Sequence, residues 1–200
     1  MSRPAQSAVP PDDALKAAFA PYIEAAGEVV NAWNRLHETL KDVFAAVTKM
    51  PREMAYAIWH SCRSDSLQRE MLRAAIAATS DKEPWVVRLP EAKSDLMLLL
   101  QRASKTGEIR NDAIHAPVSL ALDGGKLVII PVYFNGNPRA EKLKDKDIVA
   151  EFKRCRDDAS ILQEFAEKAV TAINFPRYPW PDKPALLIPP EKQKRIRRTR

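Results

Sequence analysis

The stretch that decides the fold is residues 15–47, LKAAFAPYIEAAGEVVNAWNRLHETLKDVFAAV. Its apolar side chains recur at alternating spacings of four and three residues, at Leu15, Phe19, Tyr22, Ala26, Val29, Trp33, Leu36, Leu40, Val43 and Val47. This period places them in one continuous stripe on an α-helix. Asp12 or Asp13 can cap the helix, and Pro21 removes a backbone donor inside it, which predicts a kink or a fresh start there. We expect the stripe to be either the spine of a bundle or a dimer surface.

Helical patterns predict four more helices, at residues 52–62, 64–78, 91–105 and from about Asp147 to Ile173. Asp65, with Gln68 three residues later, has the form of a capping box at the start of the second of these. Gly107 is the residue type favoured just past a helix end, so it is expected to end the third.

The period changes to that of strands in residues 118–134. The segments VSLAL and KLVIIPVYF flank a DGG turn, which predicts a β-hairpin, and Pro131 confines its strand to an edge. The fold class is therefore mainly all-α: an up-down helical bundle with a small β-hairpin inserted before the last helix. Its expected limits are 12–175, between a disordered start at 1–11 and a proline-rich extended segment with a basic tail at 176–200.

Composition and charge describe a near-neutral domain with a basic end. Apolar residues at 46% and charged residues at 29% are those of an ordinary globular protein. The net charge of +6 comes mostly from residues 191–200, EKQKRIRRTR, which can neutralise phosphates or serve as a solvated end. Cys62 and Cys155 lie far apart in the sequence, and we expect both to be reduced, buried residues. With no leader and no apolar run long enough for a bilayer, we expect a cytoplasmic protein.

Several cofactor and metal sites are excluded by the absence of their motifs. The sequence has no GxGxxG or GxxxxGK[ST] phosphate loop, no HExxH, no EF-hand loop and no GxSxG elbow. We therefore expect neither a metal nor an organic cofactor.

The stretch RNDAIHAP, residues 110–117, carries the chemistry that stands out. The guanidinium of Arg110 can bind a phosphate through two hydrogen bonds, and the imidazole of His115 can take up or return a proton near neutral pH. If the stretch is helical, the two are separated by a rise of ~7.5 Å and a rotation of ~140°. They would then flank a pocket, or each would meet its counterpart from a second copy. Asn111 can bond either partner or the phosphate. The alternative is a polar turn in which His115 packs beside Pro117.

Arg110, Asn111 and His115 resemble the R-polar-x3-H signature of HEPN domains, and WNRLHETLKDVF and IWHSCRSDSLQREML also resemble HEPN-like bacterial proteins. The resemblance covers residues 28–175. It implies a metal-independent endoribonuclease of toxin or phage-defence type that acts on RNA as a homodimer. By this analogy His115 is the acid and base, Arg110 binds the phosphate and Asn111 supports them. The hairpin separates the motif from the last helix more than in a minimal family member.

Further polar residues are assigned as candidates for substrate binding: Asp65, Arg69 and His60. Asp65 and Arg69 also have the i, i+4 spacing of a stabilising ion pair, and His60 lies between apolar residues, as a core histidine does. His37, beside Trp33, is likewise expected to be a core histidine.

Two other functions remain open. One is a non-catalytic helical dimerisation or adaptor module whose basic tail contacts nucleic acid. The other is an antitoxin or nucleotide-transferase partner that acts with a neighbouring gene product.

Overall fold

The computed structural model describes residues 12–132 and 136–187. The predictions for the start of the chain at 1–11, for the end of the hairpin at 133–134 and for the basic tail at 191–200 lie outside these residues.

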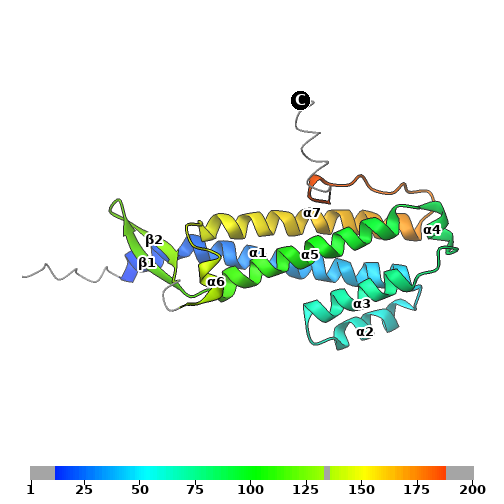
Figure 1. Ribbon diagram of the computed structural model, residues 1–200, viewed down its shortest axis with the longest axis horizontal. Coiled ribbons are helices and arrows are strands. Elements are labelled where there is room, and N and C mark those ends of the chain that lie inside the picture. The colour runs from blue at the N-terminus through cyan, green and yellow to red at the C-terminus, as the bar shows by residue number, and fades with distance from the viewer. Residues whose placement is uncertain (1–11, 133–135, 188–200) are drawn as a thin grey trace, which may run out of the picture.

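The described chain is a helical bundle with one β-hairpin (Figure 1), which confirms the expected fold class. Its elements are α1 (Asp12–Thr48), α2 (Arg52–Ser61), α3 (Asp65–Ala78), α4 (Pro84–Arg88), α5 (Ala92–His115), β1 (Val118–Asp123), β2 (Lys126–Pro131), α6 (Pro138–Glu141), α7 (Ile148–Asn174) and the 3-10 turn η1 (Ala185–Leu187). The longer helices α1, α2, α3, α5 and α7 alternate in direction along the chain, as an up-down bundle requires. The short helices α4 and α6 were not predicted.

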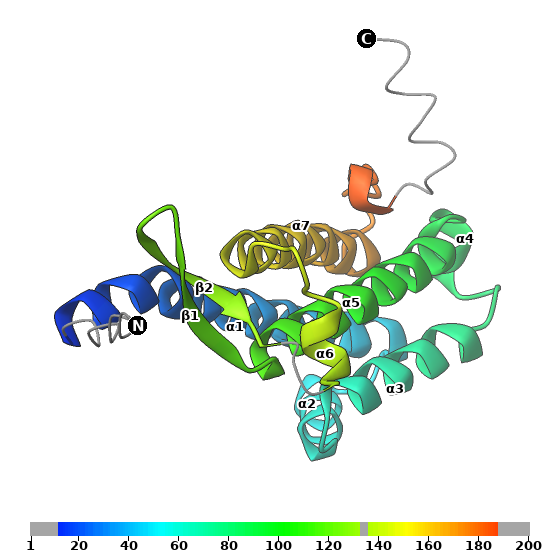
Figure 2. The ribbon, with the colours of Figure 1, turned by 60° about the vertical axis from the view of Figure 1, so that its left-hand side comes forward.

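Four helices surround the core in the order α1, α7, α5, α3, and each packs chiefly on its two neighbours. Figures 1 and 2 show α7 on one side of the α1–α5 pair and α3, with α2 outside it, on the other. The α2–α3 pair covers only the half of the bundle nearest α4, while the hairpin and α6 lie at the opposite end. The C-terminal end of α5 therefore extends beyond the N-terminal end of α3.

The apolar stripe of α1 is the spine of the bundle rather than a free dimer surface. From Val29 to Val47 its members are at most 4% exposed, whereas Leu15, Phe19 and Tyr22 are only partly buried. The helix runs unbroken through Pro21, so no fresh start occurs there.

The expected end of the third predicted helix at Gly107 is wrong, because α5 continues to His115. Gly107 serves a different purpose: a Cβ at this position would lie 2.6 Å from Cη2 of Trp33. Since two carbon atoms cannot approach so closely, α5 needs a glycine where it passes the indole of α1. The helix ends instead before Pro117, which disfavours a helical residue 116.

The hairpin has the predicted form within its described residues. Val118 pairs with Pro131 and Asp123 with Lys126, so Gly124 and Gly125 alone make the turn. Both glycines have positive φ, at 54° and 81°, as a tight two-residue hairpin turn demands.

The segment after α7 packs back onto the bundle. Trp180 Nε1 donates to Asp95 Oδ2 over 3.0 Å, and Lys183 Nζ lies 2.7 Å from Asp95 Oδ1. Asp95 is fully buried and Leu187 of η1 enters the main core. Among the described residues, no helix has the length and apolar character that a membrane crossing needs.

Candidate functional site

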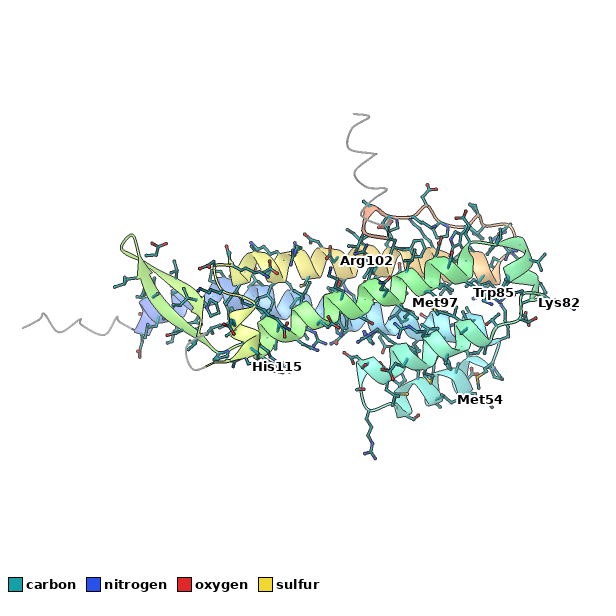
Figure 3. The ribbon with its side chains drawn as sticks, in the orientation of Figure 1. Met54, Lys82, Trp85, Met97, Arg102 and His115 are labelled. Carbon is teal, nitrogen blue, oxygen red and sulfur yellow. The ribbon has the colours of Figure 1, made fainter. Side chains whose placement is uncertain are left out.

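The last turns of α5 present two of the predicted site residues to solvent. Asn111 and His115 are both exposed, and because they are four residues apart they lie on the same face of the helix. Figure 3 shows His115 at the end of α5 farthest from α4. The neighbouring Asp112 is held by Lys142, whose Nζ lies 2.7 Å from its Oδ2, so this helix end is fixed to the segment after α6. Within the described chain, no hydrogen bond occupies the imidazole of His115.

Arg110 points to a different side of α5, into the bundle. Its Nη2 donates to Asp65 Oδ2 over 3.2 Å, and its guanidinium carbon lies 4.9 Å from the ring centroid of Trp33. The side chain is 17% exposed, and its Nε is buried without a hydrogen-bond partner among the described residues. The described residues thus do not bring Arg110 and His115 into one pocket: the helical rotation of ~140° keeps them apart within one chain.

Asp65 connects three helices. Its Oδ2 accepts both the bond from Arg110 and a 2.7 Å bond from Trp33 Nε1. The predicted capping box is wrong, since the residue that caps α3 is Ser64, whose side chain accepts from the Leu67 backbone. Asp65 is therefore free to use its carboxylate for tertiary contacts.

Arg69 and His37 form the inner part of the same cluster. Arg69 Nη1 lies 3.0 Å from Nε2 of His37, and Arg69 Nε donates to Ser104 Oγ over 3.3 Å. The predicted i, i+4 ion pair with Asp65 is replaced by these contacts: in the described chain the ion-pair partner of the Asp65 carboxylate is Arg110. The guanidinium also lies 5.4 Å from the Trp33 ring centroid.

The hydrogen bonds assign the tautomer of His37. Because a guanidinium can only donate, Nε2 of His37 must accept. Nδ1 then carries the proton and donates to Oε1 of Gln68 at 3.1 Å, and Nε2 of Gln68 donates to the Trp59 carbonyl at 3.2 Å. Every polar atom in this chain of bonds has one consistent role, and the imidazole is neutral.

The ionisation of the cluster follows from its surroundings. Burial, with the positive charges of Arg69 and Arg110, lowers the pKa of His37. Burial opposes ionisation of Asp65, but the bond from Trp33 and the nearby cationic side chains outweigh it and hold the pKa of Asp65 below its usual 3.8. Among the described residues Asp65 pairs with Arg110 alone, so the cluster has two guanidinium charges and one carboxylate, and one positive charge in it has no acidic partner within the cluster.

His60 lies elsewhere. It is exposed on α2, next to the buried Trp59, so the expectation of a core histidine is wrong. Among the described residues, no hydrogen bond, ion pair or ring contact joins it to the cluster. Of the residues assigned to substrate binding, Asp65 and Arg69 therefore belong to the cluster and His60 does not.

The residues that complete the cluster, Trp33, His37, Gln68 and Ser104, were not predicted as site residues. Trp33 and His37 are one helical turn apart, and Asp65, Gln68 and Arg69 share one face of the next-but-one helix. Two such faces of complementary polar groups are the signal that could have found the cluster.

Groups of three or more His, Cys, Asp or Glu side chains close enough to hold a metal ion do not occur in the described residues. Hollows of about 560 and 470 Å³ lie along the segment 178–183, away from the C-terminal end of α5 where Asn111 and His115 lie. Comparisons of the chain with protein-family models, with curated proteins and with solved structures found no match.

Proposed function

We propose that this protein is a metal-independent, HEPN-like endoribonuclease that acts as a homodimer. The observation that carries the proposal is the exposed pair Asn111 and His115 on the last turns of α5, next to an arginine whose position is fixed by Asp65 and Trp33. An imidazole without a partner in the described chain is available for proton transfer.

The proposed reaction is an internal transfer at phosphorus. His115 removes the proton of a ribose 2′-hydroxyl, the 2′-oxygen forms a bond to the adjacent phosphorus, and the bond from phosphorus to the 5′-oxygen breaks. The leaving 5′-oxygen receives a proton from an imidazolium, and the products are a 2′,3′-cyclic phosphate and a 5′-hydroxyl. Arg110 would bind the phosphate as its negative charge grows, and Asn111 would hydrogen-bond the same group.

The geometry of α5 is the reason for proposing two copies. In one chain the guanidinium of Arg110 and the imidazole of His115 leave the helix on different sides. If two α5 ends approach each other, His115 of one copy can face the phosphate held by the other. The second imidazole then supplies the acid that protonates the leaving oxygen.

The test is RNA cleavage by the purified protein in the presence of EDTA. We expect cyclic-phosphate products from the wild type and a loss of about 10²–10⁴-fold in rate for His115→Ala, which removes the proton-transfer group. Gln101→Ala changes another exposed residue of α5 and should cleave as the wild type does. Cleavage that survives His115→Ala, or that EDTA abolishes, rules out this mechanism.

A non-catalytic dimerisation or adaptor module is the second candidate, because Arg110 has structural contacts that account for its presence. Asp65 and Trp33 both lose a partner if it is removed. This function predicts self-association without RNA turnover, and nucleic-acid binding that is lost when residues 191–200 are deleted.

A further inference from the structure

We infer that the carboxylate of Asp65 occupies the place of a substrate phosphate on Arg110, and that an RNA phosphate binds by displacing it. This inference rests on the proposed function, because it concerns how the same arginine meets its substrate. It makes Asp65 an autoinhibitory contact rather than a substrate-binding residue.

The exposures of the two partners show which one lies outside. The side chain of Asp65 is 47% exposed, whereas that of Arg110 is 17% exposed. The carboxylate is thus the outer member of the ion pair, and a phosphate that approaches Arg110 from solvent meets a negative charge first. Since like charges repel and the guanidinium is already bonded, RNA and Asp65 compete for one partner.

The cluster retains a charge that favours a second anion. Arg69 and Arg110 both lie against the Trp33 ring, at 5.4 and 4.9 Å from its centroid, and Asp65 is the only acidic side chain bonded to either guanidinium within the described chain. When Asp65 moves away, Trp33 Nε1 loses its acceptor, and Nε of Arg110 already has none. The guanidinium of Arg110 and the indole N–H of Trp33 are then left without their shared acceptor, and a phosphate can accept from both.

The contact is weak enough to be displaced. Exposed ion pairs contribute about 0.2–1 kcal/mol; with this as the scale for a pair whose carboxylate is 47% exposed, the contribution corresponds to a factor of up to about five in a binding constant. A phosphate that replaces the carboxylate can accept the bond from Trp33 Nε1 in its place. Asp65 stands in the first turn of α3, directly after the loop from α2, so a change of its side-chain rotamer does not require α3 to move.

The variant Asp65→Asn tests the charge of the carboxylate separately from its hydrogen bond to Trp33. The amide oxygen of asparagine can still accept from Trp33 Nε1, while the charge that neutralises Arg110 is gone. Asp81→Asn is the matched control: it removes an equal charge near the other end of α3, where Asp81 pairs with Lys93 at 2.8 Å. Melting curves of both variants establish that they fold.

The first measurement is binding of a fully 2′-O-methylated RNA, which cannot be cleaved by 2′-oxygen attack. We expect Asp65→Asn to bind about three- to fivefold more tightly than the wild type and Asp81→Asn to be unchanged. Combining Asp65→Asn with Arg110→Lys should remove most of the gain, because the planar two-bond contact to phosphate is lost. Equal gains in the Asp65 and Asp81 variants, or a gain that does not depend on Arg110, overturn the inference.

A second measurement uses the unaltered protein, so it does not depend on how a variant folds. During titration with the methylated RNA, the indole N–H signal of Trp33 in an NMR spectrum should shift as its acceptor leaves. The indole of Trp180, which donates to the buried Asp95, should not. RNA binding with an unmoved Trp33 signal contradicts the displacement.

Cleavage of unmodified RNA distinguishes this inference from the proposed function. Tighter binding by Asp65→Asn without cleavage by either protein supports the displaced carboxylate and rejects the ribonuclease. Cleavage by the wild type at a rate that Asp65→Asn does not raise at subsaturating RNA supports the ribonuclease and rejects the autoinhibitory contact.

Discussion

Replacing Gly107 by alanine tests the packing that holds the candidate site together. A Cβ at this position would lie 2.6 Å from Cη2 and 2.9 Å from Cζ2 of Trp33. The tip of a side chain could often move aside, but this ring cannot do so easily: it is 2% exposed, its Nε1 is bonded to Asp65, and the His37 ring lies 4.8 Å away. We therefore expect Gly107→Ala to strain the junction of α1 and α5.

The magnitude follows from two opposing effects. Alanine stabilises a helix interior by about 1 kcal/mol relative to glycine, whereas forcing an extra carbon into a packed core costs about 1–3 kcal/mol. Gly27→Ala isolates the first effect, because Gly27 lies in the interior of α1 and a Cβ there would meet nothing within 4 Å. The free energy of unfolding of Gly107→Ala should thus fall below that of Gly27→Ala by about 1–3 kcal/mol.

The assay is urea denaturation followed by far-ultraviolet circular dichroism, with a thermal melt beside it. For a chain of this size the expected gap in free energy corresponds to a difference in Tm of roughly 2–12 °C, and Gly27→Ala should melt at or above the wild type. If the two alanine variants have the same stability, the close approach of Gly107 to Trp33 is not what α5 needs at this position.

Two further predictions concern buried ionisable side chains. The pKa of His37 is lowered in the folded protein. Below the usual pKa of about 6.5, the unfolded chain therefore binds a proton that the folded protein does not. As the pH drops below that value, the free energy of unfolding should fall by up to about 1.4 kcal/mol per pH unit. Denaturation curves measured from pH 7.5 to 5 check this, and His37→Gln should flatten the slope; an unchanged slope would show that His37 is not its source. Lys183→Met leaves the buried carboxylate of Asp95 without its ion partner and should cost about 1–3 kcal/mol in urea denaturation, less than a fully buried pair because Lys183 is about one-third exposed. Lys168→Met, in an exposed pair with Glu164, should change stability by less than about 0.5 kcal/mol, and equal effects of the two lysine variants would contradict the argument.

The sequence was sufficient for the elements whose signal is local. The stripe of α1 predicts a buried helix because its period is read within one segment, and the hairpin follows from strands on either side of Gly124 and Gly125. The end of α5 was mistaken because glycine has two uses: a helix end and a close approach. Only the position of Trp33, which lies 74 residues earlier in the sequence, distinguishes them.

The candidate site likewise contains residues that a local pattern identifies and residues that only the tertiary structure brings to it. Arg110, Asn111 and His115 could be selected from one short stretch, since their spacing is itself the signal. The helical period predicts the ~140° separation of Arg110 and His115, but not which of the two faces the bundle. That depends on α1 and α3, which place Trp33 and Asp65 on the side of Arg110. Trp33 and His37 come from α1 and Asp65 and Arg69 from α3, and only the packed bundle brings these helices against Arg110, so no pattern within one segment joins them to it.

The two sides of α5 also decide how mutations of the motif must be interpreted. His115 is exposed and no bond of the described chain depends on it, so a loss of activity in His115→Ala at unchanged stability reports chemistry. Arg110 contributes to the packing of Trp33 and to the ion pair with Asp65, so Arg110→Ala can abolish activity merely by loosening the cluster. An effect of Arg110 on activity therefore counts as phosphate binding only if the variant retains the unfolding free energy of the wild type, or if Arg110→Lys, which keeps the charge beside Asp65, shows the same loss.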